Sequence, residues 1–337
     1  MNINKVVHQF LQTLPELKEK LIAVGYSAGA DSTVLLHVMH QKSKHFGFNL
    51  EAVFFNHSGS PINEGEDNII LARKFCKSLN IPLVEVDLNL TKVPKKSWEQ
   101  LGRNGRLKFY KNSNYDFVFL GHHKDDQNET TMMQIFRGGG KGVGGMKPRD
   151  GIFCRPMLDV TKNDIYKYLK ENKIPWFEDP TNNNTDFTRN FWRKIGLPTI
   201  EKHYPNYSQL LDSFREKNNN LHKLAFDMAK IDGLELFLSG KTINVSSLPE
   251  YRFYNLLTQS FQFIGNSLEK NKIDNMLKTG KSNKEINIYV GDFCIKFDGK
   301  NLKLLQLNQN NSINNVSNNN ILNKNNFKKS LKHSKVF

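Results

Sequence analysis

The sequence of 337 residues is poor in cysteine and has no long hydrophobic run. Its cysteines, Cys76, Cys154 and Cys294, lie far apart and are odd in number, so they predict neither a disulfide framework nor a CxxC metal or redox site. No stretch approaches the ~18 apolar residues of a membrane span, and the N-terminal residues contain no apolar signal core. We therefore expect a soluble protein of a reducing compartment, the cytoplasm.

Acidic residues are scarce, and they are missing from the C-terminal end. The 48 Lys and Arg residues outnumber the 33 Asp and Glu residues, which gives a net charge of +15. From Gly299 onward there are seven lysines and no acid, so about half of the excess lies there. A basic surface attracts polyanions such as nucleic acids, but the C-terminal end alone does not account for the excess.

The segment 27–32, between the first predicted strand and its helix, has neither of two familiar nucleotide-binding patterns. It lacks the spacing of a Walker A loop, because no GKS or GKT follows it, and it is not a GxGxxG. Apolar runs nevertheless alternate with segments of helical periodicity. Strands are expected at 21–25, 50–55, 82–88 and 116–120, and helices at 31–39, 65–79, 97–111, 125–136 and 161–172. This alternation predicts an α/β fold with a doubly wound parallel sheet, whose ligands bind at the carboxyl ends of the strands.

The chain is long enough for roughly two domains. We expect a catalytic domain over 1–205 and a smaller, mostly helical domain over 206–307, because Pro198 and Pro205 interrupt the chain and helical periodicity follows from Tyr207. A small sheet is expected near residues 286–307. Eleven of the nineteen residues from Asn308 to Asn326 are Asn, so we predict that 308–337 form a disordered Asn/Lys-rich tail.

The segment Ser27-Ala-Gly-Ala-Asp-Ser32 lies between the first predicted strand and its helix. Backbone N–H groups at such a junction, together with the positive end of the helix, can hold a phosphate. Gly29 allows close approach, and Ser27 and Ser32 can donate hydroxyl hydrogens. Asp31 either stabilises the helix N-terminus or holds Mg²⁺ against phosphates. A tight turn with a helix cap is the alternative interpretation.

The segment Gly121-His-His-Lys-Asp-Asp-Gln-Asn-Glu-Thr130 begins another helix after a strand. Asp126 and Glu129 are three residues apart, so their carboxylates share a face, where like charges destabilise a helix unless a cation offsets them. His123, Asp126 and Glu129 would also suit a metal hydrolase. Alternatively, the acids stabilise the helix N-terminus, and Asp125 is the better candidate for that role.

Both segments resemble known motifs. The first resembles the SGGxDS signature of the PP-loop, or N-type, ATP pyrophosphatases, with Ala28 in place of the first glycine. The second is similar to the GHHxDDQxET motif of the tRNA(Ile)-lysidine synthetases. Further segments resemble motifs of that family in the same order: Phe55-Asn-His57, a helix with Glu99, Arg103, Arg106 and Tyr110, Arg137-Gly-Gly-Gly with Gly144-Gly-Met146, Arg155-Pro-Met-Leu158, 176–182 and Arg189-Asn-Phe-Trp-Arg193.

The resemblance implies a Rossmann-like N-type ATP pyrophosphatase fold and a ligase reaction in tRNA processing. ATP, with Mg²⁺, would adenylate the wobble cytidine of an isoleucine tRNA with a CAU anticodon, and free L-lysine would then displace AMP to give lysidine. The expected partners are this tRNA and lysine, with a homodimer as one option for assembly and no membrane.

The resemblance also implies roles for individual residues. The expected catalytic residues are Asp31, Asp126, Glu129 and Arg189, and the expected metal ligands are Asp31 and Asp126. The expected ATP-binding residues are Ser27, Ala28, Gly29, Ala30, Asp31, Ser32, Asn56, His57 and His123. The expected tRNA-binding residues are Arg103, Arg106, Tyr110, Arg137, Asn190 and Arg193.

Other functions stay open at this point. A PP-loop tRNA thiolase would need sulfur-carrying cysteines, usually paired, and this sequence offers no pair. A metal hydrolase would use the His/Asp/Glu cluster, and a small-molecule ligase would leave the basic C-terminal part without a role. An RNA-binding module that has kept only the fold would not need Ser27, Asp31, Ser32 and Asp126.

Overall fold

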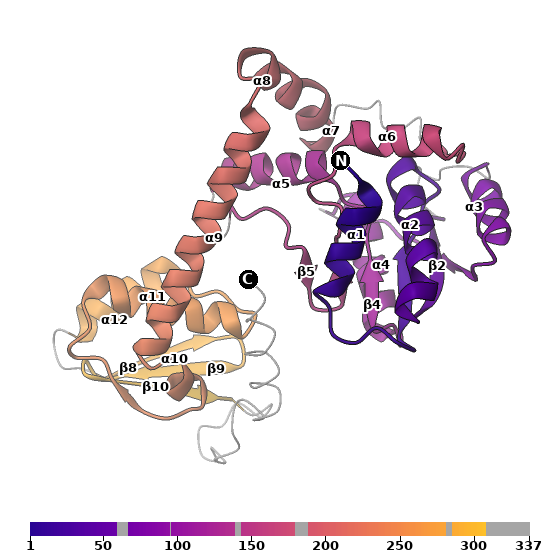
Figure 1. The fold of residues 1–337 in the computed structure, drawn as a ribbon. Coiled ribbons are helices and arrows are strands. Elements are labelled where there is room, and N and C mark those ends of the chain that lie inside the picture. The colour runs from indigo at the N-terminus through magenta and orange to yellow at the C-terminus, as the bar shows by residue number, and fades with distance from the viewer. Residues whose placement is uncertain (59–66, 95, 139–142, 179–187, 281–284, 308–337) are drawn as a thin grey trace. The chain divides into compact units, whose positions relative to one another are not determined.

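The computed structural model describes residues 1–58, 67–94, 96–138, 143–178, 188–280 and 285–307 (Figure 1). The chain divides into two compact units, Met1–Glu216 and Lys217–Phe337. The predicted Asn/Lys-rich tail, 308–337, lies outside the described residues, as do positions 139–142 and 179–182 of the family motifs. Of the helices in the described ranges, none is long and apolar enough to cross a membrane.

The first unit is built on a six-stranded sheet with the order β3-β2-β1-β4-β6-β5. The strands are β1 (Leu21–Gly25), β2 (Asn49–Asn56), β3 (Leu83–Asp87), β4 (Phe117–Phe119), β5 (Arg149–Asp150) and β6 (Phe153–Cys154). All neighbouring pairs are parallel except β5 with β6. The predicted doubly wound sheet is therefore confirmed, and its strand order reverses between β1 and β4, where such folds bind ligands.

Helices follow the strands as the periodicity predicted. They are α2 (Ala30–Phe46), α3 (Asp67–Ser78), α4 (Trp98–Asn112), α5 (Lys124–Phe136) and α6 (Lys162–Glu171), and an N-terminal helix that was not predicted, α1 (Ile3–Gln12), precedes them. Both faces of the sheet are covered: Ile22 and Val24 of β1 pack in one hydrophobic cluster with α1, α2 and α6, and Ala23 packs in another with α4. Only the strand ends are left for polar residues, which is why the candidate site lies there.

Tyr110 belongs to this second cluster. Its ring is 2% exposed and makes edge-to-face contacts with Phe55 and Phe153. The expected tRNA contact is therefore wrong for this side chain, because a ring enclosed by the core offers no face on which a base could stack.

The segment after residue 187 is helical, although the sequence predicted an interruption of the chain at Pro198. It forms α7 (Thr188–Phe191), a π-helical turn η2 (Trp192–Gly196) and α8 (Leu197–His203), with Pro198 in the first turn of α8, where proline costs no hydrogen bond. The next helix, α9 (Tyr207–Ile231), begins where periodicity predicted it and ends before Gly233, whose φ is +97°. The division between the units falls within α9, beyond the boundary expected after residue 205.

The second unit combines helices with a small antiparallel sheet of order β7-β10-β9-β8. Its further elements are α10 (Leu234–Leu238), β7 (Ile243–Asn244), α11 (Glu250–Phe263), α12 (Lys270–Gly280), β8 (Ile286–Val290), β9 (Phe293–Phe297) and β10 (Asn301–Gln306). The three strands expected near residues 286–307 are confirmed, whereas two-residue β7 was too short to show periodicity. Phe237, Phe261, Ile295 and Leu304 are fully buried and form the core of this unit.

Candidate active site

The loop between β1 and α2 has the geometry of a phosphate cradle. Ser27 and Ser32 hold it closed, since the Ser27 N–H donates to Ser32 Oγ at 3.2 Å and the Ser32 hydroxyl donates to the Gly29 carbonyl at 3.1 Å. Gly29 is the N-cap of α2 and makes no side-chain cap, so the first N–H groups of the helix face outward without an intrahelical partner. Such N–H groups suit an anion.

Ala28 lies in this loop with a positive φ of +62° and no exposed surface. Its carbonyl accepts hydrogen bonds from the Thr33 hydroxyl at 3.2 Å and from the Phe177 N–H at 2.9 Å. These bonds hold the backbone in the left-handed region, where a glycine would be unstrained. The alanine that departs from the family signature therefore carries backbone strain.

The loop after β4 leads into α5 through a capping box. The backbone N–H of His123, the N-cap, donates to Asp126 Oδ2 at 3.0 Å, and the Asp125 N–H donates to His123 Nδ1 at 3.3 Å. The capping acid is thus Asp126, and the expectation for Asp125 is wrong. Asp126 occupies the third helical position, from which a side chain can reach back to the N-cap, whereas Asp125 does not.

The two loops lie against each other because β1 and β4 are adjacent and parallel. A Cβ atom on Gly121 would lie 3.1 Å from the backbone nitrogen of Ser32, so a larger residue there would push the loops apart. His123 Nε2 lies 3.7 Å from Asp31 Oδ1 and 3.5 Å from Asp126 Oδ2. The carboxylates of both motifs therefore meet at one buried imidazole, as expected for polar residues at neighbouring strand ends.

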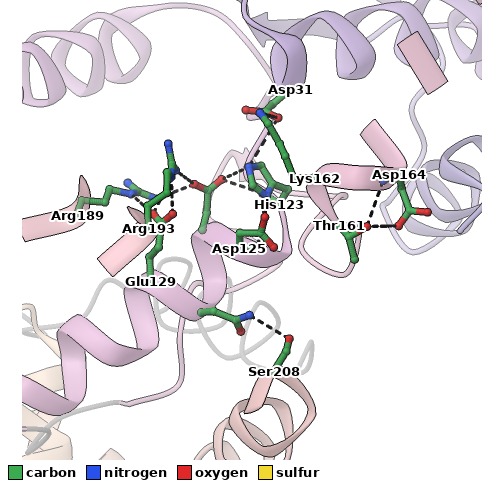
Figure 2. A network of polar contacts seen from close by, with 12 residues as sticks. Asp31, His123, Asp125, Glu129, Thr161, Lys162, Asp164, Arg189, Arg193 and Ser208 are labelled. Atoms are coloured by element: carbon green, nitrogen blue, oxygen red, sulfur yellow. Dashed lines mark hydrogen bonds and ion pairs between the residues drawn. The ribbon is translucent and has the colours of Figure 1, made fainter. Parts of the chain in front are cut away.

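Asp126, Glu129, Arg189 and Arg193 form what we call the acid–arginine cluster; Figure 2 shows Glu129 and both arginines. Arg189 Nε donates to Glu129 Oε2 at 2.7 Å, and Arg193 Nε donates to Glu129 Oε1 at 2.6 Å. The Nη2 groups of both arginines donate to Asp126 Oδ1 at 3.0 Å. Glu129 has no exposed surface, so the arginines supply the cation that two adjacent carboxylates require.

This arrangement changes the acidity of the neighbouring carboxyl groups in opposite directions. Burial by itself would raise the pKa of Asp126, but the charges of His123, Arg189, His122 and Arg193 outweigh it and hold the pKa at about 2. Asp125 is desolvated and faces the Asp126 and Glu129 carboxylates, and its pKa is raised. At neutral pH Asp126 is therefore an ionised binding group, and Asp125 is the better proton acceptor of the two.

His122 lies in a strongly cationic part of the site. Burial, with the charges of Arg155, Arg189 and Arg103, lowers its pKa to about 4 despite the nearby Asp126. In the part of the chain that the structure describes, the buried atoms His122 Nδ1 and Arg155 Nε have no hydrogen-bond partner. A neutral imidazole and several guanidinium groups thus face the same region, which favours an anionic or polar ligand.

His57, at the end of β2, accepts a hydrogen bond from Arg106. Nη1 of Arg106 lies 3.0 Å from His57 Nε2, and burial together with the Arg106 charge lowers the pKa of His57. Asn56 is exposed at the end of the same strand. The strand end expected to contact ATP is therefore next to the phosphate loop, since β2 and β1 are paired in parallel.

Lys162 also belongs to the site, although the motifs did not indicate it. Its Nζ donates to Asp31 Oδ1 at 2.6 Å, as Figure 2 shows, and lies 5.1 Å from the centre of the Tyr166 ring. One signal was available in the sequence: Lys162 follows Thr161, the N-cap of α6, and a cation in the first turn opposes the helix dipole. Such a residue is kept for another reason than helix stability.

The other residues expected to bind tRNA are placed differently from one another. Arg103 and Arg137 are exposed, and Asn190 is half-buried. Arg106 and Arg193 point their guanidinium groups at His57 and at the acids, respectively. The structure thus leaves Arg103 and Arg137 as surface cations, while the other arginines shape the site.

A buried arginine of α9, Arg215, holds that helix on α5. Its Nη1 donates to Asn128 Oδ1 at 3.2 Å and to Thr131 Oγ1 at 3.0 Å, and Nη2 pairs with Asp212. The Asn128 amide also donates to Ser208 Oγ at 3.0 Å (Figure 2). The first turns of α9 therefore belong to the first unit, which explains why the division between units falls after Glu216. No sequence motif indicated this role.

Among the residues that the structure describes, Asp31 at the phosphate loop is the best candidate to hold a divalent cation. Within the described ranges, no group of three or more His, Cys, Asp or Glu side chains is placed to hold a metal ion. Mg²⁺ is commonly bound by one or two carboxylates together with substrate phosphates, and Asp31 could supply such a carboxylate. Asp126 is less suitable, because its Oδ1 accepts from two arginines and its Oδ2 from His123.

Comparisons with known proteins agree with this geometry. The PP-loop domain family matches residues 2–200. The tRNA(Ile)-lysidine synthase of Nitrosomonas europaea is 32% identical over 63% of this chain and 47% of its own, and that of Thermosipho africanus is 28% identical over 87% and 69%. A U34-tRNA thiolase structure from Methanococcus maripaludis shares the fold, with a TM-score of 0.51 and 20% identity over 64% of this chain and 78% of its own. The chain spans about half the length of the Nitrosomonas relative.

The strain at Ala28 leads to a stability prediction. Ala28→Gly removes a left-handed alanine, worth about 1–2 kcal/mol, and adds unfolded-state entropy worth about 0.4–1 kcal/mol. We expect the free energy of unfolding to rise by up to about 1 kcal/mol, measured by urea denaturation. Ala30→Gly, in the first turn of α2, is the matched control and should lower it by about 0.5–1 kcal/mol. If the free energy of unfolding falls by the same amount in both variants, Ala28 carries no backbone strain.

The lowered pKa of His122 leads to a pH prediction. Because this pKa is about 4 in the folded chain and 6.5 ordinarily, the unfolded chain binds more protons between these values. The contribution of His122 to the free energy of unfolding is therefore complete above pH 6.5. It is lost as the pH falls through 4, and the total loss is about 3 kcal/mol. Urea denaturation from pH 4.5 to 7 should show a flatter dependence for His122→Gln than for wild type. An unchanged slope, with exposed His203→Gln as control, would refute it.

Proposed function

The chain belongs to the PP-loop family, and from that premise we propose that it is a tRNA(Ile)-lysidine synthetase. In this reaction ATP adenylates the base carbonyl oxygen of the wobble cytidine in a CAU anticodon and releases pyrophosphate. The side-chain amine of free L-lysine then displaces AMP, which gives lysidine. ATP, Mg²⁺, lysine, the isoleucine tRNA and a homodimer all belong to this proposal. The names of the relatives support an isoleucine tRNA as the substrate and lysidine as the product.

One observation carries the proposal: an anion cradle follows strand β1, a pair of buried carboxylates follows the adjacent strand β4, and both lie at the same edge of the sheet. The cradle at Ser27–Ser32 suits the phosphates of ATP, and the carboxylates of Asp126 and Glu129 suit a cationic substrate. The His123 imidazole lies within 3.7 Å of Asp31 and 3.5 Å of Asp126, so both halves share one side chain. An enzyme that joins an amine to an activated nucleotide needs this combination.

The loop would serve the first step. Its N–H groups and hydroxyls would hold the pyrophosphate half of ATP and stabilise the charge that develops as pyrophosphate leaves. A Mg²⁺ ion bound at Asp31 would neutralise the same oxygens. Arg189 and Arg193 lie beside the acids, where their guanidinium groups could stabilise the adenylate or a tRNA phosphate.

The acids would serve the second step. The Asp126 and Glu129 oxygens accept five hydrogen bonds from guanidinium groups, and a lysine ammonium would bind there by replacing some of these donors. Before it attacks, the ammonium must lose a proton. Asp126, with a pKa of about 2, is too weak a base, and the raised pKa of Asp125 makes it the better acceptor.

The rival functions receive less support. A thiolase needs an accessible thiolate, but Cys76 and Cys154 are buried, and burial raises the pKa of both thiols to about 12. Cys294 is also buried. For a metal hydrolase built on His123, Asp126 and Glu129, the carboxylates would have to leave the arginines that hold them.

Lysine transfer tests the proposal directly. The full chain is incubated with ATP, labelled lysine and either a CAU-anticodon isoleucine tRNA or the CAU-anticodon methionine tRNA. We expect label in the isoleucine tRNA alone, and release of one pyrophosphate per lysine incorporated. Label in neither RNA would refute the function, and equal label in both would refute its specificity.

Two variants separate the steps. Asp31→Ala should abolish pyrophosphate release but leave tRNA binding intact. Asp125→Asn should retain tRNA-dependent pyrophosphate release and slow lysine transfer about a hundredfold or more, because the better proton acceptor of the site is lost. Exposed Glu201→Gln, in α8, is the control for a general effect of charge. Loss of tRNA binding in Asp31→Ala would favour an RNA-binding module instead.

A further inference from the structure

The phosphate loop has no cation of its own. Over residues 26–33 its single charged side chain is Asp31, which is negative. In Walker A loops, by contrast, a lysine within the loop contacts the β- and γ-phosphates. Backbone N–H groups and hydroxyls can bind the oxygens of a polyphosphate, but they leave most of its negative charge uncompensated. The Asp31 carboxylate adds a further negative charge. A cation from elsewhere in the chain would offset this charge, in addition to any Mg²⁺.

Lys162 is placed to supply it. Its Nζ lies 2.6 Å from Asp31 Oδ1, and both side chains are about one third exposed, at 30% and 31%. Asp31 stands in the first turn of α2, where the N–H groups have no intrahelical partner and suit an anion. The ammonium on its carboxylate therefore lies beside the helix end at which a phosphate would bind.

The position of Lys162 does not depend on its ion pair. Thr161 and Asp164 form a capping box around the start of α6, and Ile165 and Leu169 are fully buried in the core. The next turn is joined to α2 by the hydrogen bond between His37 Nδ1 and the Tyr168 hydroxyl at 2.9 Å. Because the helix is held without it, the Lys162 side chain can exchange one oxygen partner for another without loss of structure.

We propose that Lys162 is a phosphate-contacting residue, whose ammonium is shared between Asp31 and the pyrophosphate half of ATP. In Walker A loops a lysine of the loop itself contacts the phosphates. Here Lys162 would supply this cation from a helix, 131 residues after Asp31 in the chain. The proposal rests on the proposed function only in taking ATP as the ligand. Lys162 then favours binding of ATP and of pyrophosphate, but not of AMP.

Binding measurements on the full chain test this. The affinities of ATP, pyrophosphate and AMP are measured by titration calorimetry, with Mg²⁺ and separately with EDTA. Lys162→Gln keeps a polar side chain but removes the charge, and it should weaken ATP and pyrophosphate binding about tenfold or more, as expected for one charge-assisted hydrogen bond. AMP binding should change less than about twofold. Lys162→Arg should restore part of the loss.

Lys167→Ala is the matched control, because this lysine lies on the same helix and is 74% exposed beside Glu171. It should bind all three ligands like the wild type. If Lys162→Gln binds ATP and pyrophosphate with wild-type affinity, or weakens AMP binding to the same extent, the proposal is overturned. Thermal unfolding of each variant shows whether the fold is retained.

A second comparison separates phosphate contact from simple neutralisation of Asp31. In an Asp31→Asn background the carboxylate charge is gone, so a lysine that served only to neutralise it would have no further effect. We expect Lys162→Gln still to weaken pyrophosphate binding about tenfold in this background, measured with EDTA. No loss there would assign Lys162 to Asp31 alone and overturn the proposal.

The proposed function can fail separately. If the wild-type chain binds ATP and pyrophosphate but transfers no lysine to tRNA, the lysidine synthetase assignment falls and the Lys162 measurements still decide its role. If lysine transfer proceeds and Lys162→Gln binds ATP like the wild type, the assignment stands without the Lys162 contact.

Discussion

The first unit depends on how the carboxylate of Glu129 is neutralised. Glu129 has no exposed surface, and removing one partner of such a buried pair typically costs about 3–5 kcal/mol. Arg189 and Arg193 satisfy it from a segment 60 and 64 residues away. The short helices α7 and η2 are therefore tied to α5 by charge, whereas Arg215 ties α9 to α5 through hydrogen bonds to Asn128 and Thr131. Helix α5 is the element on which the later part of the unit is assembled.

The same need for charge compensation explains the chemistry of the site. Acids of two loops, Asp31 and Asp126, are brought close to one histidine, and cations from α6 and η2 offset them. Burial, together with the charges of further arginines, lowers the pKa of His122 and of His57 and leaves both imidazoles uncharged at neutral pH. The site thus combines neutral imidazoles, ionised acids and a surplus of cations, which suits reactions in which charge develops on phosphate.

Several parts of this site could be predicted, and the reasons differ. The phosphate loop and the loop before α5 were located because each follows an apolar strand, and parallel strands end at the same edge. The role of Asp125 was misjudged, since the choice between it and Asp126 depends on a single helical position at the N-cap. Tyr110 was misjudged because an aromatic residue near arginines in sequence can point into the core. Lys162 and Arg215 were missed because their partners are distant in sequence.

The sequence by itself determined the alternation of strands and helices, the doubly wound sheet and the edge at which the site lies, because these follow from periodicity and from loops of a few residues. Tertiary structure alone decided which charges meet. The Asp31–Lys162 pair joins residues 131 positions apart, and the acid–arginine cluster joins α5 to a segment with no periodic signal. Such pairs depend on how helices pack on the sheet, and local sequence does not specify this packing. The sequence therefore predicted the edge of the sheet at which the site lies, and the pairing of buried charges in the folded chain determines which residues form it.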